Sequence, residues 1–571
     1  MAPMNIMIDR DVMVPLRDGT RLATDVFRSA DDGPHPTLLL RTPYNKRNRA
    51  TWGPALLEFD DALERGYAVV VQDCRGTGAS EGTFAPILQE RGDGHDAIEW
   101  AAEQPWSNGR VGMWGMSYMG VTTLQACVDA PAALKVAVAY MTAGDHSSSW
   151  GRTGGAFELG FNLRWALDQA AGQLARSGAV DEALATEVRD EVDRFWADHR
   201  GFYASNLDPA RIAPATATVV PSYRQLLEQD DAVMAGIDTI AQAERFSVPV
   251  LAIAGWQDGM LRSLLRLHAA LVGKGPEHLR DHHRLIVGPW DHGAYLSPMT
   301  GAMAGVRHFG PGAVGGRVGL KDQALSFLDR WLVDDTAPPS PKVRYFDMGP
   351  NRWVDDDVWP PEAETGRWHL WSGGRANSRR GDGRLARLPP PAQPSDGFTY
   401  DPIDPVPTVG GRSLLYPFTP SGFQEQSAVE DRDDVLVYTS AALVEPVTVR
   451  GSLALDLFVR TSAPTTDFAA TLADVSDDGS FSVADGITRL DPGVPGELRR
   501  VVIDLGDTSY RFDVGHRIRV NLTSSSFPRF DRNRNVAPDA DGPACAVAVQ
   551  HVLHDPEHPS ALVLPHPTSP A

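Results

Sequence analysis

A serine flanked by glycines ends one of the apolar runs of this sequence. The segment VGMWGMSYMG (111–120) carries Ser117, with Gly115 two residues before it and Gly120 three residues after it. A serine on a sharp strand-to-helix turn has its hydroxyl exposed for nucleophilic attack, and such a turn needs small neighbours. The usual second glycine would stand at position 119, which is methionine here. The local pattern alone therefore also fits an ordinary tight turn.

Asp258 and His292 supply the two partners that a nucleophilic serine needs, a base and a carboxylate that orients the base. Asp258 follows the apolar run VPVLAIAG (248–255), and His292 follows HRLIVG (283–288). The order serine, acid, histidine is the one found in α/β-hydrolases. Because three residues at three strand ends in this order are more specific than one motif, we predict that Ser117, Asp258 and His292 form a catalytic triad.

Neighbouring residues fit the triad less well. His282 lies just before the apolar run 283–288 and His283 begins it, so both are at the opposite end of the predicted strand from His292. Asp291 adjoins His292, and an adjacent side chain does not easily turn to orient that ring. A surface or capping role is expected for Asp291.

Two tyrosines are candidate donors to the oxyanion that forms when an ester is attacked. The backbone N–H of Tyr118, directly after Ser117, is the expected first donor. The second normally comes from a loop after an early strand, where TLLLRTPYNK (37–46) has no glycine-rich run but offers the Tyr44 hydroxyl. The alternative role for Tyr44 is an aromatic ring that packs the loop.

Two other patterns suggest cofactors, but their details do not support one. VVVQDCRGTGASEG (69–82) has its third glycine one place too late for a dinucleotide-binding turn, and no helix opens directly after it. The histidines of HVLHDPEHP (551–559) lie in a polar, proline-containing stretch without cysteines, which favours a solvated loop over a zinc site. Neither a cofactor nor a metal is expected.

The elements around the predicted triad indicate an α/β fold. Continuous apolar runs alternate with amphipathic stretches, which is typical of a parallel sheet covered on both faces; these runs are 37–41, 67–73, 110–114, 134–140, 248–255 and 283–288. Residues 145–243 interrupt the series with helix-favouring sequence rich in Ala, Leu and Glu. We predict one α/β domain over residues 1–144 and 244–337, with a helical insertion domain over 145–243.

The remainder of the chain has a different pattern. After the linker-like TAPPSPK (336–342), short strand-like runs such as KVRYFDMG (342–349) alternate with turn residues every 8–12 positions. This spacing is typical of an antiparallel β-sandwich. We predict an all-β domain over residues 338–571.

Composition excludes several classes of partner. The 571 residues carry a formal net charge of −21, which argues against nucleic acid and anionic membrane surfaces as partners. The amino terminus has no signal-peptide pattern, and no run of apolar residues is long enough for a transmembrane helix. Three widely spaced cysteines form neither a disulfide framework nor a metal site. A cytoplasmic protein with a small-molecule substrate is expected, and both a monomer and a homodimer remain open.

Six motifs in this order resemble one family: RTPYNK, QDCRGTGASEG, GMWGMSYMG, AGWQDG, GPWDHG and SSSFPRFDRN. Together they are similar to the cocaine-esterase-like serine hydrolases, relatives of X-Pro dipeptidyl-peptidases and α-amino-acid ester hydrolases, and above all to the bacterial cocaine esterase branch. The resemblance spans nearly the whole chain. It implies an α/β-hydrolase domain, a helical insertion and a carboxyl-terminal jelly roll. It also implies the same triad, with the Tyr44 hydroxyl and the Tyr118 N–H as the oxyanion hole.

The resemblance further implies a substrate pocket between the three domains. Its candidate residues, each of which also fits an interdomain core, are Trp150, Trp165, Met260, Leu415 and Tyr416. The expected function is a serine carboxylesterase that hydrolyses small esters, including those with an aromatic acyl group, through an acyl-enzyme. The alternatives are an Xaa-Pro dipeptidyl-peptidase or an α-amino-acid ester hydrolase or amidase, which needs carboxylates for a free ammonium group, and a carbohydrate-binding protein with a degenerate hydrolase domain.

Overall fold

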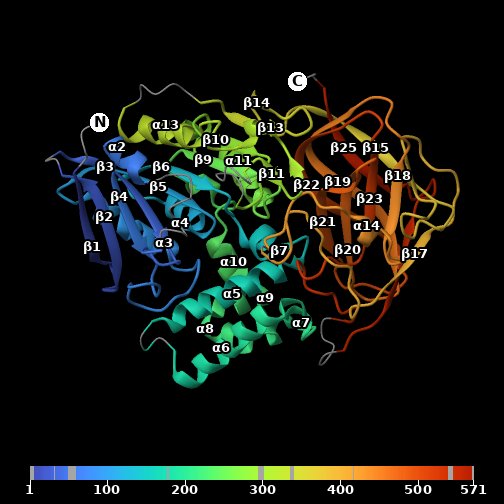
Figure 1. The fold of residues 1–571 in the computed structure, drawn as a ribbon, viewed down its shortest axis with the longest axis horizontal. Helices are drawn as coiled ribbons and strands as arrows, with labels where there is room; N and C mark the ends of the chain where they lie inside the picture. Colours follow the sequence, from blue (N-terminus) through green and yellow to red (C-terminus); the bar gives the residue numbers. More distant parts are fainter. Residues whose placement is uncertain are drawn as a thin grey trace.

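Three parts of the chain are distinct in Figure 1: a mostly parallel sheet with its helices, a group of helices beneath it, and a β domain. The computed structural model describes residues 5–30, 33–48, 59–176, 178, 180–229, 231–293, 301–334, 340–415, 417–537 and 544–568. This arrangement confirms the predicted fold class, an α/β core with a helical insertion and an all-β carboxyl-terminal domain.

The first sheet is parallel from β4 to β13 and antiparallel at both edges. In spatial order its strands are β1 (Ile6–Pro15), β2 (Arg21–Ser29), β4 (Ala68–Asp73), β3 (His35–Thr42), β5 (Ser107–Met116), β6 (Leu134–Tyr140), β9 (Val250–Gly255), β10 (Arg284–Gly288), β13 (Val343–Asp347) and β14 (Arg352–Asp356). All carboxyl ends of the parallel strands lie at one edge, where binding sites form in open α/β sheets.

Helices cover both faces of this sheet because alternate strand residues point to opposite sides. Leu39 and Val70 pack in the cluster that includes residues of α3 (Glu90–Ala102), α4 (Tyr118–Cys127) and α11 (Leu261–Lys274). Leu38 and Val69 pack on the other face, with α2 (Phe59–Glu64) and α13 (Leu320–Leu332). Both faces are fully buried, which explains the continuous apolar runs in the sequence. A short helix, α12 (Glu277–Arg280), precedes β10.

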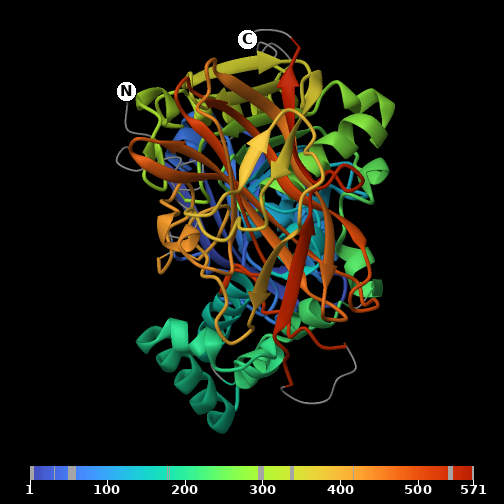
Figure 2. The same cartoon turned by 90° about the vertical axis from the view of Figure 1, so that its right-hand side faces the viewer.

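The helical insertion leaves the sheet after β6 and returns at β9. Figure 2 shows its helices projecting below the rest of the molecule. Its elements are η1 (His146–Trp150), β7 (Arg152–Thr153), β8 (Ala156–Phe157), α5 (Leu159–Leu174), α6 (Glu182–Ala197), α7 (His199–Ala204), η2 (Pro209–Arg211), α8 (Pro214–Val219), α9 (Pro221–Glu228), α10 (Asp231–Ile237) and η3 (Ala243–Arg245).

The β domain is built around the 15-residue strand β19, which pairs with β22, β24 and β25. Its elements are β15 (Ala363–Trp371), β16 (Arg384–Ala386), β17 (Asp396–Tyr400), α14 (Ser427–Glu430), β18 (Leu436–Ser440), β19 (Val447–Thr461), β20 (Asp467–Ser476), β21 (Gly479–Arg489), β22 (Arg499–Phe512), β23 (Arg517–Thr523), β24 (Ala548–Leu553) and β25 (Ala561–Pro567).

The strand expected at 342–349 forms, but it belongs to the first sheet rather than to the β domain. β13 pairs in parallel with β10, through Leu285 and Val343, and β14 continues the same sheet. The sheet therefore extends to residue 356, beyond the domain boundary expected between 337 and 338. That boundary itself lies outside the described residues.

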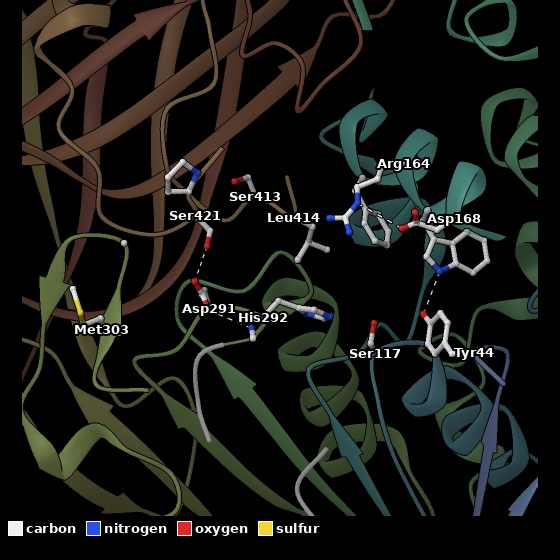
Figure 3. Close-up of a pocket in the computed structure, with 15 residues that line it drawn as sticks. Tyr44, Ser117, Arg164, Asp168, Asp291, His292, Met303, Ser413, Leu414 and Ser421 are labelled. Atoms are coloured by element: carbon white, nitrogen blue, oxygen red, sulfur yellow. Dashed lines mark hydrogen bonds and ion pairs between the residues drawn. The ribbon is translucent and has the colours of Figure 1, made fainter. Parts of the chain in front are cut away.

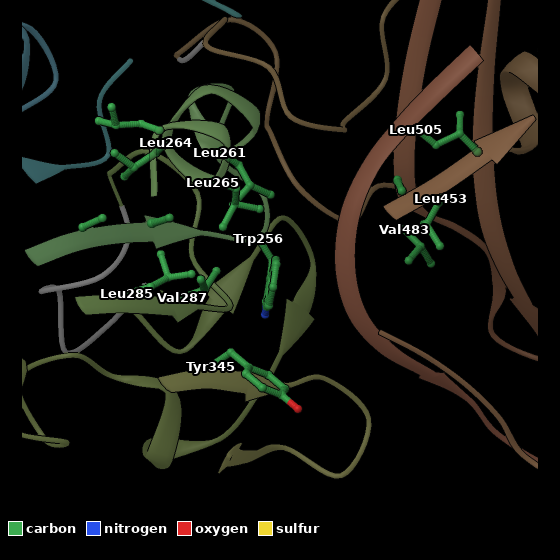
Figure 4. Close-up of a cluster of buried hydrophobic side chains, with 14 of the residues drawn as sticks. Trp256, Leu261, Leu264, Leu265, Leu285, Val287, Tyr345, Leu453, Val483 and Leu505 are labelled. Atoms are coloured by element: carbon green, nitrogen blue, oxygen red, sulfur yellow. The ribbon is translucent and has the colours of Figure 1, made fainter. Parts of the chain in front are cut away.

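One apolar cluster joins the two large domains (Figure 4). Trp256, which follows β9, is fully buried, and its ring lies 4.9 Å from that of Trp359, measured between centroids. On the β-domain side the same cluster includes Leu453, Val483 and Leu505.

Before α13 the chain forms β11 (Met303–Ala304), β12 (Arg307–His308) and η4 (Pro311–Ala313). Among the described residues, no helix has the length and apolar character that crossing a bilayer requires.

Candidate active site

Ser117, the candidate nucleophile, stands on a strained turn between β5 and α4. Its backbone has φ 55° and ψ −125°, a conformation that residues other than glycine rarely adopt. A Cβ atom on Gly115 would lie 2.1 Å from the Met119 carbonyl oxygen, and one on Gly120 would lie 2.5 Å from Thr142 Cβ. Both glycines are therefore required by close approach, and Gly120 supplies the space although Met119 occupies the usual glycine position.

Backbone hydrogen bonds hold this turn in place. The Ser117 N–H donates to the Tyr140 carbonyl on β6 at 3.0 Å. The Ser117 carbonyl accepts from the Thr142 hydroxyl at 2.7 Å. The last residue of the neighbouring strand β6 and a residue just after that strand thus fix the serine that follows β5.

Asp258 and His292 meet at the carboxyl edge of the sheet. Asp258 follows β9 and is fully buried, and His292 follows β10. The His292 Nδ1 lies 2.9 Å from Asp258 Oδ1. A proton on Nδ1 directed at the carboxylate leaves Nε2 as the basic nitrogen. Figure 3 shows the His292 ring extending toward Ser117, and both residues line the same cavity.

The surroundings of His292 raise its pKa above the usual value near 6.5. Burial opposes protonation of the ring, but the charge of Asp258, its hydrogen bond and the charge of Asp291 outweigh it. The imidazolium that forms when a base accepts a proton is therefore stabilised.

Tyr44 lies beside Ser117 with its hydroxyl directed into the same region (Figure 3). Its oxygen accepts a hydrogen bond from the Trp165 indole Nε1 at 3.2 Å. Burial raises the pKa of Tyr44 to about 12, while hydrogen bonds with Trp165 and Ser117 oppose that rise. Tyr44 is therefore a neutral phenol at neutral pH, and its proton is available for donation.

Tyr118 begins α4, so its N–H belongs to the first helical turn, where amides have no intrahelical acceptor. Its ring is fully buried, does not line the cavity, and is stacked on the cavity-lining Trp165 with 5.6 Å between centroids. The backbone of Tyr118, rather than its ring, is the part that can face a bound ester.

The three parts of the chain enclose a cavity of about 680 Å³, a size usual for small-molecule sites. The sheet domain contributes Ser117, His292 and Tyr44. The remaining lining residues are Phe161, Arg164, Trp165, Asp168, Asp291, Gly293, Met303, Gly305, Ser413, Leu414, Pro420 and Ser421.

One face of α5 forms the insertion's wall of this cavity. Phe161, Arg164, Trp165 and Asp168 recur at the spacing i, i+3, i+4, i+7, which brings them to one side of a helix. Arg164 Nε lies 3.6 Å from Asp168 Oδ2, and the Asp168 side chain is 44% exposed. Helical periodicity counted from Trp165 is the sequence signal that identifies the other three.

The predicted pocket residues have different surroundings. Trp165 lines the cavity, whereas Trp150 (0% exposed), Met260 (1%) and Leu415 (3%) are buried behind it. Leu414, the neighbour of Leu415, reaches the cavity instead. Tyr416 lies outside the described residues.

The β domain makes hydrogen bonds with the two loops that carry Asp258 and His292. The Ser421 hydroxyl donates to Asp291 Oδ2 at 2.7 Å, beside His292. The buried Arg412 donates from Nε to the Trp256 carbonyl at 3.0 Å, two residues before Asp258. Gln257 Nε2 donates to the Val483 carbonyl at 3.0 Å. Asp291, expected in a surface or capping role, accepts a hydrogen bond from the Gly293 N–H at 3.2 Å and is also part of the domain contact and of the cavity wall.

One possible metal-binding group occurs in the described part of the chain. It consists of His95, Asp96 and Glu99 on α3, whose potential ligand atoms lie close together. Asp96 is already bonded to Arg17, whose Nε lies 2.7 Å from Oδ1. None of these residues lines the cavity.

Known proteins provide an independent comparison. The profile of the X-Pro dipeptidyl-peptidase (S15) family matches residues 18–294. The profile of the X-Pro dipeptidyl-peptidase carboxyl-terminal non-catalytic domain matches residues 337–563. The chain is 36% identical to the cocaine esterase of Rhodococcus sp. (strain MB1 Bresler), over 98% of this chain and 99% of that one.

Solved structures resemble the whole chain. An α-amino-acid ester hydrolase superimposes with a TM-score of 0.81 at 26% identity, covering 99% of this chain and 97% of the other. An aminopeptidase from a marine sediment Thaumarchaeota archaeon gives the same TM-score, 0.81, at 24% identity and the same coverage, 99% and 97%. The second likeness concerns the fold alone.

Proposed function

Because the chain belongs to the cocaine-esterase-like family of serine hydrolases, we propose that it hydrolyses small esters, including those with an aromatic acyl group, through an acyl-enzyme on Ser117. The enzyme class, a serine esterase, follows from the family relationship. The substrate class is supported by the cavity, whose walls include Phe161, Trp165 and Leu414. Apolar and aromatic walls suit an apolar acyl group.

One observation carries the proposed mechanism. His292 Nδ1 lies 2.9 Å from the buried carboxylate of Asp258, while His292 and Ser117 line one cavity. In this arrangement His292 Nε2 takes the proton from Ser117 as its oxygen attacks the ester carbonyl carbon. Asp258 orients the ring and stabilises the imidazolium. His292 then gives the proton to the departing alcohol.

The negative oxygen of the tetrahedral intermediate needs donors that are already in place. We assign this role to the Tyr44 hydroxyl and the Tyr118 N–H. Water then attacks the acyl-enzyme, His292 acts again as base, and the carboxylic acid leaves as Ser117 recovers its proton. Each half of the cycle uses the same residues.

Hydrolysis of esters with a free amine is a second candidate, favoured by one observation. The Asp168 carboxylate is partly exposed in the cavity wall, and its ion pair with Arg164 is longer than a hydrogen bond, at 3.6 Å. Such a carboxylate can accept a hydrogen bond from a substrate ammonium. Peptide or X-Pro cleavage would need the same recognition.

A fluorophosphonate followed by peptide mass mapping tests the nucleophile. We expect one phosphonyl group on Ser117, and loss of both labelling and turnover in Ser117→Ala. Modification of another residue, or none, would contradict the mechanism. A panel of esters in which the acyl and alcohol parts vary separately then defines the substrate, and paired N-acetylated and free-amine esters distinguish the two candidates.

A further inference from the structure

A buried ion pair lies beneath the turn that carries Ser117. Arg41, on β3, is fully buried, and its NH1 donates to Glu90 Oε2 at 2.7 Å. Its Nε donates to Gln72 Oε1 at 2.9 Å. Glu90, the first residue of α3, is 3% exposed. None of these side chains lines the cavity.

The other carboxylate oxygen of Glu90 binds the residue that follows the nucleophile. The Tyr118 hydroxyl donates to Glu90 Oε1 at 2.9 Å and accepts from the Ile87 N–H at 2.6 Å. The phenol is thus bonded on both its donor and its acceptor side. Since Tyr118 is fully buried, its ring has little freedom to move.

Through its place at the end of β3, Arg41 also lies close along the chain to Tyr44, the second proposed oxyanion donor. Arg41 stands three residues before Tyr44, whose N–H donates to Thr42 Oγ1 at 3.1 Å. The Arg41 carbonyl accepts from the Thr122 hydroxyl on α4 at 3.2 Å. The end of β3 and the start of α4 are therefore bonded to each other directly and through Glu90.

A charged pair is a costly choice for this place. Burying two charges removes their hydration, and apolar side chains of similar volume often give equal or greater stability. What the pair provides beyond stability is a fixed direction for each hydrogen bond. That direction matters where a displacement of about 1 Å can cost a hundredfold in rate.

We propose that Glu90, held by Arg41, is a positioning residue for the oxyanion hole: through the Tyr118 hydroxyl it fixes the Tyr118 N–H relative to the Tyr44 hydroxyl. The inference rests on the proposed function, because it assigns a role to the same site. It adds two residues that touch neither the substrate nor the triad.

The variant Tyr118→Phe tests this without removing the ion pair. The number of active sites is counted by labelling to completion with a fluorophosphonate, and kcat is expressed per labelled site. We expect kcat to fall about 10- to 100-fold, because a displaced oxyanion donor costs no more than a donor that is removed. KM should change less than about threefold. Affinity for a boronic acid, whose tetrahedral adduct occupies the oxyanion hole, should fall by the same factor as kcat.

Glu90→Gln is the second variant, because its amide oxygen still accepts from Tyr118 while the charge that holds Arg41 is lost. Counting the labelled sites separates a smaller amount of folded enzyme from a lower kcat per site. A lower yield of folded protein therefore does not obscure the result. We expect kcat per site and boronic acid affinity to fall together here too.

Tyr438→Phe is the matched control, since that buried hydroxyl also donates to a buried carboxylate, Asp396 Oδ2, at 2.7 Å in the β domain. Its kcat per site should equal that of the unaltered protein. If Tyr118→Phe has fewer sites but each turns over normally, the network is structural only and the inference is overturned. If the unaltered protein is not labelled on Ser117, the proposed function itself fails.

Discussion

The indole nitrogen of Trp165, on the helical insertion, donates to the hydroxyl oxygen of Tyr44, on the loop after β3, at 3.2 Å. The bond occupies the acceptor side of the hydroxyl and leaves its proton for another acceptor. Trp165, expected either to contact substrate or to belong to an interdomain core, therefore also orients the group that we assign to the oxyanion.

We predict that Trp165→Phe lowers kcat about three- to tenfold, the effect of one neutral hydrogen bond, because Phe keeps an apolar wall but donates nothing. Tyr44→Phe should cost about 10²- to 10³-fold, as loss of an oxyanion donor does. A double-mutant cycle on purified proteins measures the coupling. If Trp165→Phe lowers kcat equally in both backgrounds, the hydrogen bond is not the cause.

Asp291, together with Asp258, should shift the pH at which activity is lost in acid. His292 must be neutral to accept a proton, so its raised pKa places the acid limb of kcat/KM above the ordinary histidine value near 6.5. Asp291→Asn removes one of the charges that raise this pKa, while the amide oxygen still accepts from Ser421. The limb should move to lower pH. Asp357→Asn, at an exposed carboxylate after β14, is the control. A limb that stays or rises in Asp291→Asn refutes the assignment.

The glycine after Met119 should tolerate no side chain. Gly120→Ala brings a Cβ within 2.5 Å of Thr142 Cβ, so we expect a loss of about 1–3 kcal/mol in the free energy of unfolding. Gly172, in α5, has no atom within 4 Å of an added Cβ. Gly172→Ala should therefore gain about 0.5–1 kcal/mol from helix propensity. Urea unfolding measures both, and equal effects would show that the turn is not tightly packed.

Two adjacent leucines should respond differently to the same truncation. Leu414 lines the cavity, so Leu414→Ala should raise KM for esters with bulky acyl groups and leave the unfolding midpoint nearly unchanged. Leu415 is 3% exposed and packs against Gly160 of α5. Leu415→Ala should cost about 2–5 kcal/mol of stability. Thermal unfolding and KM, measured on both, check the pair; a KM effect confined to Leu415→Ala would reverse the assignment.

Much of the candidate site could be predicted because the order of the strands alone brings these residues together. Ser117, Asp258 and His292 follow β5, β9 and β10, and parallel strands end at the same edge of a sheet. The apolar runs that define those strands are continuous because both faces are covered. Neither inference requires knowledge of side-chain contacts.

The remaining features depend on tertiary contacts that a local pattern does not contain. Alternation predicts that 343–347 is a strand, but not that it pairs with β10 rather than with the β domain. Leu414 and Leu415 are the same residue type in sequence, and only their surroundings separate cavity from core. The buried bond from Tyr118 to Glu90 joins residues 28 positions apart and has no local signal.

The contacts from Arg412, Ser421 and Val483 to the loops that carry Asp258 and His292 also have a consequence for biosynthesis. These residues are translated long after Asp258 and His292, at about 5–20 residues per second, while upstream domains already fold. A nascent chain that has completed its sheet still lacks the bonds that hold Trp256, Gln257 and Asp291. We therefore expect hydrolytic competence to be deferred until the β domain has emerged from the ribosome, and a prematurely terminated product to be inactive.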